Sequence, residues 1–320
     1  MVANQYQNTD LFWALRGGGG GTFGVVVSAT VRTFPEVPVI TAQIDFFTFN
    51  TTAFWQALEI FHTHLPSIND AGGSGYYFVT PAATPGNVSI TSMAFFFANV
   101  SDTGYVNRTL GPAVDGISAL LGNASVVYVP YYAPASKYVF ATILNGTDDA
   151  TGSVARTGSR LVSHDFLAAP DGPARLSAAL QQIMEISPVG FTGHVVAGGQ
   201  VARNKNTVDS ALNPAWRRTL AHITIGVSWA DDASLEVQQA QTSLLTNQLV
   251  PLLRALEPDM GAYLNEADAD EVDFQQSFWG ANYGRLLDLK KKMDPRGLFI
   301  TRRGVGSEEW DDDGLCRASM

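Results

Sequence analysis

Short stretches of this chain alternate between hydrophobic and polar residues, and these stretches are rich in Val, Ile, Thr and Phe. Such alternation is typical of strands that bury one face. It predicts strands at residues 22–34, 38–48, 76–79, 88–97, 126–132, 194–201 and 221–229. A turn at Pro85-Gly86 is expected to join two of them.

Other stretches repeat hydrophobic residues every three or four positions, which is typical of helices. Phe54, Leu58, Phe61 and Leu65 form one such face, with a capping threonine before them. Further helices are predicted at 10–16, 109–121, 173–185, 233–256 and before Pro295, and a polar surface loop at 144–160. Because helices lie between and after runs of strands, the pattern favours an α+β fold, an antiparallel sheet backed by helices.

The composition is that of a globular chain with a large core. Of 320 residues, 46% are hydrophobic and 16% are charged. The net charge of −10 argues against a nucleic-acid partner, and we interpret Lys290-Lys291-Lys292 as the solvated face of a helix. No apolar run reaches the roughly 18–20 residues of a membrane span, so no membrane partner is expected. His62 and His64 lie two apart with no third ligand nearby, so we expect no metal.

Six Asn-x-Ser/Thr sequons stand out against the roughly two that chance predicts. They lie at Asn50, Asn87, Asn99, Asn107, Asn123 and Asn145. Their clustering favours a secreted, glycosylated protein, although Asn, Ser and Thr also gather together in loops. Cys316 is the only cysteine, which excludes an internal disulfide.

Five consecutive glycines, Gly17 to Gly21, follow the first predicted helix and precede a β-branched stretch. No Gly-Lys-Ser/Thr follows them, so they are not a P-loop. A dinucleotide-binding fingerprint needs the order strand, glycines, helix, and here that order is reversed. Two interpretations stay open: a loop that lies flat against an extended cofactor, and a tight helix-to-strand connection without a ligand.

The residues around these glycines carry a family resemblance. Leu11 to Val27, taken with Phe278 to Leu287 and Asp294-Pro295, resembles the FAD-linked oxidases of the vanillyl-alcohol oxidase superfamily. The similarity is greatest to the berberine-bridge-enzyme-like branch and its fungal isoamyl alcohol oxidase-like members. Tyr263 to Asp268 and the C-terminal arm from Val305 to Trp310 are also similar to that group.

The resemblance implies a FAD-binding domain built from both chain ends and a substrate domain between them. Residues 1–36 would be the C-terminal remnant of the FAD-binding domain, 37–258 the substrate domain, and 259–320 a returning segment. Family members carry a further N-terminal part that holds the pyrophosphate loop and the flavin-linking histidine. We therefore expect this chain to be N-terminally truncated and to lack the first half of the FAD-binding domain as its partner.

The resemblance also implies site residues, each with a plainer alternative. FAD contacts are expected from Gly21, Gly24, Val25, Asn282 and Tyr283, although the last two also suit a helix cap and a core aromatic. Tyr263 and Glu266 are the expected catalytic residues, although Glu266 also suits an exposed acid. Gln200 and Arg203, on a predicted strand and its end, would face the substrate or be ordinary sheet residues.

The function implied is a FAD-dependent oxidase, as a fragment, that oxidises an alcohol or sugar hydroxyl with oxygen as acceptor. An alternative is a secreted glycoprotein without catalysis, unable to hold FAD alone. A third is a carbohydrate-binding surface on the sheet, suggested by the aromatics Tyr76, Tyr77, Tyr131 and Tyr132.

Overall fold

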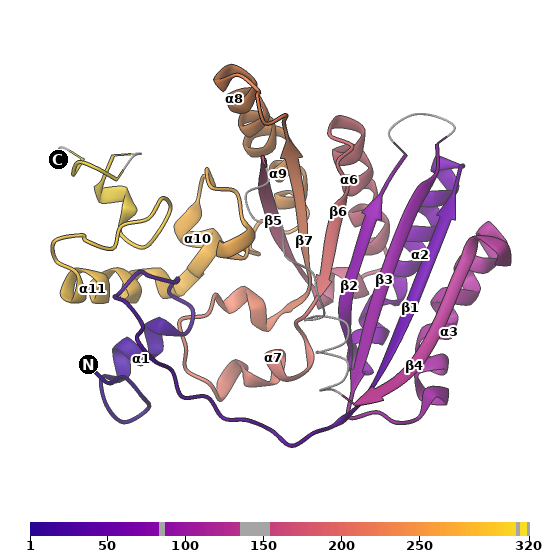
Figure 1. The fold of residues 1–320 in the computed structure, drawn as a ribbon, viewed down its shortest axis with the longest axis horizontal. Helices are drawn as coiled ribbons and strands as arrows, with labels where there is room; N and C mark the ends of the chain where they lie inside the picture. Colours follow the sequence, from indigo (N-terminus) through magenta and orange to yellow (C-terminus); the bar gives the residue numbers. More distant parts are fainter. Residues whose placement is uncertain (83–86, 135–153, 312–313, 319–320) are drawn as a thin grey trace.

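The computed structural model describes residues 1–82, 87–134, 154–311 and 314–318. Within them, seven strands form one antiparallel sheet in the order β4-β1-β3-β2-β6-β7-β5 (Figure 1). The strands are β1 Pro38–Thr48, β2 Gly73–Thr80, β3 Ser89–Ala98, β4 Val126–Pro134, β5 Ala155–Ser163, β6 Phe191–Val195 and β7 Thr219–Ser228.

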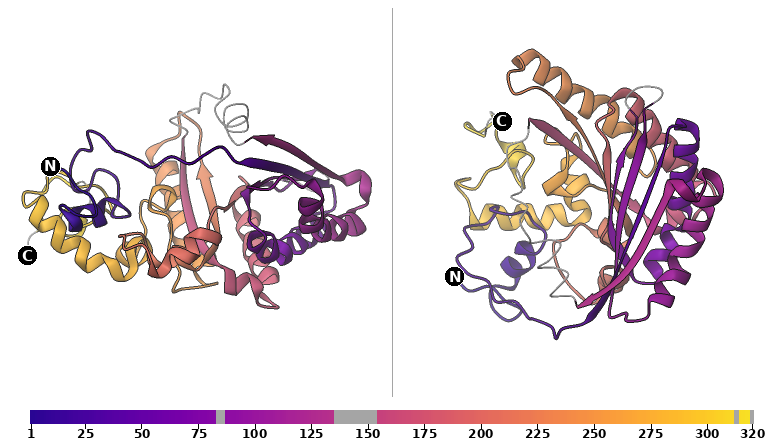
Figure 2. Two further views of the ribbon diagram at one scale, coloured as in Figure 1. Left: turned by 90° about the horizontal axis from the view of Figure 1, so that it is seen from below. Right: turned by 45° about the vertical axis from the view of Figure 1, so that its right-hand side comes forward.

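Helices cover one face of this sheet. The α-helices are α1 Thr9–Leu15, α2 Thr51–Asp70, α3 Thr103–Leu121, α5 His164–Ala168, α6 Gly172–Ile186, α7 Gly199–Arg203, α8 Leu235–Leu244, α9 Val250–Arg254, α10 Phe274–Trp279 and α11 Tyr283–Met293. Figure 2 shows α2, α3 and α6 on one side of the sheet and the C-terminal segment on the other. No helix among the described residues is long and apolar enough to cross a bilayer.

The main core lies between the sheet and these helices. On β3, Met93, Phe95 and Phe97 point to the helices and are fully buried, whereas Ile90 on the opposite face is exposed. Phe61 and Leu65 of α2 pack in the same cluster as these three side chains. The period-2 pattern of the strand and the period-3.6 pattern of the helix thus supply the two halves of one core. The predicted antiparallel sheet backed by helices is confirmed.

A second hydrophobic cluster joins the two chain ends. Trp13 and Phe23, which flank the glycine run, pack with Phe278, Trp279 and Leu286. The Trp279 indole donates a hydrogen bond to the Gly17 carbonyl (3.1 Å). Figure 1 shows α1 and α11 together at the end of the molecule away from β4. The assignment of 1–36 and 259–320 to a FAD-binding domain stays a prediction.

Lys290 is buried, and the prediction that the whole basic run is solvated is wrong. Its side chain is only 4% exposed, and its Nζ donates to the Thr22 carbonyl (2.8 Å), Asp294 Oδ2 (2.7 Å) and the Phe299 carbonyl (2.6 Å). Burial alone would raise the pKa of the Asp294 carboxyl, but bonds from Lys290 and from backbone N–H groups hold it below its usual value. An ammonium with three acceptors can stay charged away from water.

Two predicted strands are absent or shorter than expected. Residues 24–37 run as an extended chain without a strand partner among the described residues, because β-branched residues favour extended backbone but cannot form a sheet alone. The strand predicted at 194–201 ends at Val195, and Gly199–Arg203 is helical. Gly198 and Gly199 both have positive φ, which breaks the strand at that point.

Two other elements also differ from their predictions. The expected loop at 144–160 contains strand β5 from Ala155, while 144–153 lie outside the described residues, as does Pro85-Gly86. The predicted helix at 233–256 is α8 and α9 joined by a π-helical turn, Leu245–Leu249. Pro251 lacks an N–H group, so a regular helical ladder cannot continue through it.

Replacing Lys290 with methionine leaves the Asp294 carboxylate without its cation in a buried site. We expect Lys290→Met to lower the free energy of unfolding by about 3 kcal/mol, measured by urea denaturation. Lys291→Met is the matched control, since Lys291 lies in the same helix turn but is exposed and pairs with Glu309 at the surface. Equal urea midpoints for the two variants would contradict this account.

Candidate functional site

Two histidines face each other on the side of the sheet away from the helices. His194 of β6 and His222 of β7 are directly paired across the two strands, and their ring centroids are 5.0 Å apart. Their neighbours Val195 and Ile223 point to the helices and belong to the main core. Alternation along each strand therefore places both imidazoles on the opposite face.

The C-terminal segment lies across this face of the sheet. Arg160 of β5 forms an ion pair with Glu271 (2.6 Å), and the side chains are 2% and 1% exposed. Arg254 also pairs with Glu271, and Leu161 N–H donates to the Gly261 carbonyl (2.9 Å). Burial lowers the pKa of the Arg160 guanidinium, and Glu271 opposes that shift. The backbone bond holds Gly261 beside β5, and the two ion pairs anchor Glu271 to β5 and α9.

The fixed segment brings Glu266 to the histidine pair. Glu266 Oε2 lies 3.6 Å from His222 Nδ1 and 3.7 Å from His194 Nε2. Burial, and then the neighbouring His194, lower the pKa of His222 to about 3. Burial also lowers the pKa of His194, and Glu266 opposes that shift. Both imidazoles are therefore uncharged at neutral pH, and the carboxylate faces two neutral rings.

Aromatic rings surround the same three groups. The Tyr263 ring meets His222 and Trp216 edge to face, each with centroids 5.7 Å apart. Tyr76 of β2 meets His194 on the other side, at 5.4 Å. The Tyr263 hydroxyl accepts a hydrogen bond from Asn265 Nδ2 (2.7 Å). The rings form one wall, with the Glu266 carboxylate at its edge; its members are Tyr76, His194, Trp216, His222 and Tyr263.

A cavity of about 240 Å³ connects this wall to the glycine run. Gly17, Gly19 and Gly20 line one side of it, and Trp216 and Tyr263 line the other. The structure thus brings the predicted cofactor loop and the predicted catalytic tyrosine to one cavity, although they are far apart in sequence.

The glycines of the run have different surroundings. A Cβ atom on Gly17 would lie 2.2 Å from the Leu212 backbone nitrogen, and one on Gly18 would lie 2.6 Å from the Ala14 carbonyl oxygen. A Cβ atom on Gly20 would meet nothing within 4 Å, and the same holds for Gly21 and Gly24. Close packing therefore explains Gly17 and Gly18, whereas Gly20 faces open space.

Asn282 and Tyr283 already have hydrogen-bond partners within the chain. Asn282 Nδ2 donates to the Leu212 carbonyl (2.9 Å), and the Tyr283 hydroxyl donates to the Glu308 carboxylate (2.6 Å). Burial and the bond to Glu308 raise the pKa of Tyr283. Contacts of these two residues and of the 79%-exposed Val25 with a flavin stay predictions.

The predicted substrate residues lie on a helix and not on a strand. Gln200 and Arg203 are both in α7, one turn apart, and both are exposed. Arg203 donates to Gln200 Oε1 (3.2 Å), and Gln200 Nε2 donates to Asn204 (2.7 Å). Among the described residues the structure shows no contact between this pair and Tyr263 or Glu266, so their substrate role stays a prediction.

Other candidate residues have structural roles. His62 is buried in the core between Ser177 and the Tyr77 hydroxyl. Tyr77 itself is fully buried, so it cannot belong to the suggested carbohydrate surface; the side chains of Tyr131 and Tyr132 lie outside the described residues. Burial lowers the pKa of His62 to about 3, which keeps this core imidazole neutral.

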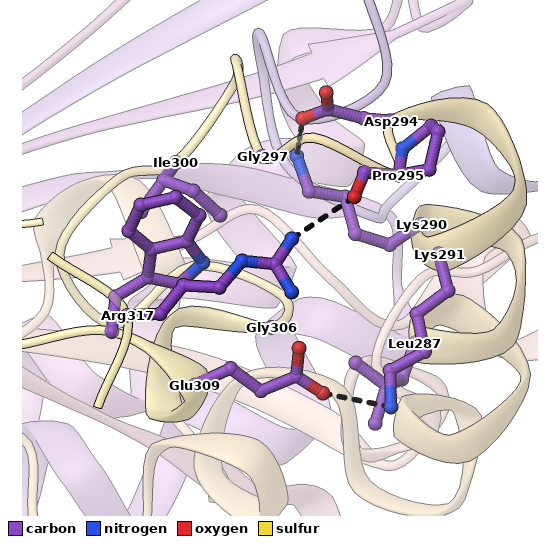
Figure 3. A pocket seen from close by; sticks show the side chains of 11 residues that line it. Leu287, Lys290, Lys291, Asp294, Pro295, Gly297, Ile300, Gly306, Glu309 and Arg317 are labelled. Atoms are coloured by element: carbon purple, nitrogen blue, oxygen red, sulfur yellow. Dashed lines mark hydrogen bonds and ion pairs between the residues drawn. The ribbon is translucent and has the colours of Figure 1, made fainter. Parts of the chain in front are cut away.

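A second cavity, of about 300 Å³, lies between α11 and the C-terminal arm (Figure 3). Arg317 donates to the Pro295 carbonyl (2.9 Å) and stacks on Trp310, and Lys291 pairs with Glu309 (2.7 Å). The charged side chains that line it thus have partners within the chain, and none of the predicted site residues lines it.

His194, His222 and Trp216 were not predicted as site residues. Alternation within each strand could have placed the two histidines on one face. The register that sets them opposite each other joins residues that are 28 positions apart in the sequence. The sequence of neither strand alone reveals that register.

Comparison with known proteins gives consistent matches. Residues 262–306 match the family described as "Berberine and berberine like". The chain is 46% identical over 324 residues to an uncharacterized FAD-linked oxidoreductase of Arthroderma benhamiae, covering 99% of this chain and 55% of that protein. It is 40% identical to the FAD-linked oxidoreductase malF of Malbranchea aurantiaca, covering 99% of this chain and 52% of malF.

Solved structures share the fold. The VAO-type flavoprotein MtVAO615 of Myceliophthora thermophila is 30% identical with a TM-score of 0.84, over 99% of this chain and 57% of that one. The carbohydrate oxidase of Microdochium nivale, at 18% identity and a TM-score of 0.67, covers 95% of this chain and 62% of its own and shows the fold alone.

The chain spans about half the length of the curated relatives it matches. Sequence relatives, family match and fold agree: residues 262–306 match the berberine-like family, and the chain as a whole is similar to FAD-linked oxidoreductases and to a VAO-type flavoprotein.

Proposed function

We propose that this chain forms the substrate side of a FAD-dependent oxidase that oxidises an alcohol or sugar hydroxyl, with oxygen as the final acceptor. The observation that carries the proposal is the cavity shared by Gly20 of the glycine run and by Tyr263. Such a reaction needs the cofactor and the substrate-orienting residues side by side, and a cavity lined by both Gly20 and Tyr263 supports that arrangement.

The glycine run fits a flat, extended cofactor. Gly20, Gly21 and Gly24 leave open space where a side chain would stand, and their N–H groups make no hydrogen bond to the described residues. Free N–H groups on a glycine backbone suit phosphate or ring oxygens that approach closely. We propose that these residues hold FAD, which supplies the acceptor for the two electrons of the substrate.

The chain's own contribution to the chemistry is the removal of the hydroxyl proton. Glu266 Oε2 lies 3.6 Å and 3.7 Å from the two imidazole nitrogens, and we propose that this carboxylate accepts that proton. Tyr263 lies beside it and would orient the hydroxyl through its own O–H group. Trp216 and Tyr76 would lie against the substrate's carbon skeleton, as flat aromatic rings do for sugars and other ring-shaped ligands.

The alternative of a non-catalytic glycoprotein also has an observation in its favour. Val25, Val26, Val27 and Phe34, which follow the glycine run, are exposed to solvent. We infer that these apolar residues pack against the additional part that the longer relatives possess. That part would then cover the open side of the glycine run, and residues 1–320 alone would bind FAD weakly.

A side chain at Gly20 should obstruct the cofactor without disturbing the fold. We expect Gly20→Val to weaken FAD binding at least about tenfold, a loss of ~1.4 kcal/mol, by flavin fluorescence titration of the complete gene product. Gly111→Val is the control, because Gly111 also faces open space but lies in α3. A complete product that folds without any bound flavin would refute the proposed cofactor, and titration of residues 1–320 tests the non-catalytic alternative.

Removing the carboxylate should slow the proton transfer. We expect Glu266→Gln to lower kcat for an alcohol or sugar by roughly 100-fold or more while FAD stays bound. Glu236→Gln, an exposed acid at the start of α8, serves as the control. Turnover unchanged by Glu266→Gln, with the flavin spectrum intact, would show that another group accepts the proton.

We also propose that the protein is secreted and glycosylated. The sequons at Asn50, Asn87, Asn99, Asn107 and Asn123 are all exposed, while Asn145 lies outside the described residues. An attached glycan is bulky and needs a surface position, which these five asparagines have. Enzymatic deglycosylation of the protein secreted by its host should lower its apparent mass on a gel. An unchanged mass, or recovery of the protein only from the cell interior, would refute this.

A further inference from the structure

His194, His222 and Glu266 present three metal-ligand atoms to one another. Two neutral imidazoles and a carboxylate are a ligand set that suits Zn²⁺ and other divalent first-row cations. The three ligand atoms all lie within 4.8 Å of one another, and no other such group is found among the described residues.

The separations match those of a metal site more closely than those of hydrogen bonds. Glu266 Oε2 lies 3.6 and 3.7 Å from the two imidazole nitrogens, beyond hydrogen-bond range. In a tetrahedral zinc site with bonds of about 2.1 Å, neighbouring ligand atoms stand about 3.4 Å apart. Two of the three separations are thus close to those of a tetrahedral site, and all three ligand atoms lie within 4.8 Å of one another.

The ligands are held in place by other parts of the fold. Cross-strand pairing of β6 with β7 fixes the two histidines, and the Arg160–Glu271 pair fixes the segment that carries Glu266. Thr224 Oγ1 lies 3.2 Å from His194 Nε2, but its proton can go to the Thr192 carbonyl at 3.3 Å. The Glu266 side chain is 40% exposed, so an ion in solution can reach the site.

We propose that His194 Nε2, His222 Nδ1 and Glu266 Oε2 bind one divalent transition-metal cation. Under the proposed function, the ion is bound by the same Glu266 carboxylate that would accept the substrate proton. Zn²⁺ bound here therefore inhibits the oxidation, and this cluster is a site of inhibition by transition metals.

His164 offers a matched comparison. It is also a histidine between carboxylates, but its Nε2 faces Asp70 (3.1 Å) and its Nδ1 faces Asp165 (4.0 Å). Ligand atoms on opposite sides of one ring cannot converge on a single ion. His164→Gln therefore removes a histidine and should leave metal binding unchanged.

The test uses residues 1–320 after treatment with a chelator and without any flavin. Calorimetric titration with Zn²⁺ should show one saturable site, and Co²⁺ should give a visible absorption spectrum of bound cobalt. His222→Gln and Glu266→Gln should each weaken Zn²⁺ binding by at least about tenfold, since even loss of an outer-shell partner costs 10–100-fold. His164→Gln should bind like the parent chain.

Two results would overturn the proposal: no saturable Zn²⁺ binding by the parent chain, or parent-like binding by both His222→Gln and Glu266→Gln. Circular dichroism checks that each variant folds. Glu266 lies on a partly exposed turn, so its variant decides the matter if His222→Gln fails to fold. Because no flavin is present, zinc binding without any FAD binding would support this site and refute only the proposed function.

Discussion

The ion pair between Arg160 and Glu271 is the contact on which the candidate site depends. It joins the edge strand β5 to the C-terminal segment, and both side chains are buried. Breaking such a pair leaves a charge buried without compensation, which costs far more than the intact pair contributes. The pair anchors Glu271 to the edge of the sheet, five residues after Glu266, and so limits where Tyr263 and Glu266 can lie.

Two kinds of glycine stand side by side in one short run. Gly17 and Gly18 allow backbone and side chains of the same chain to approach closely, so they belong to the connection between α1 and the second hydrophobic cluster. Gly20 has no such neighbour. A single stretch thus serves both as a tight connection and as an open surface, and composition alone could not separate these roles.

Much of the fold was predictable, because β1 and α2 show their periods plainly in the sequence. Strand β5 was missed since Arg156 and Arg160 resemble loop residues, and only the distant Glu271 explains a buried arginine. Residues 22–34 have strand composition, but no strand of the described part of the chain pairs with them. In the site, Tyr263 and Glu266 came from a local motif, whereas His194 and His222 meet only through the register of the sheet.

The bond from Lys290 to the Thr22 carbonyl spans 268 residues, and this separation orders events during synthesis. The main core draws its buried residues from Ile40 to Leu253, so it can assemble on the ribosome while the C-terminal segment is still unmade. The glycine loop cannot, since Trp279 and Lys290 emerge after the residues of the main core. The glycine loop is thus translated before the main core but acquires its shape after it.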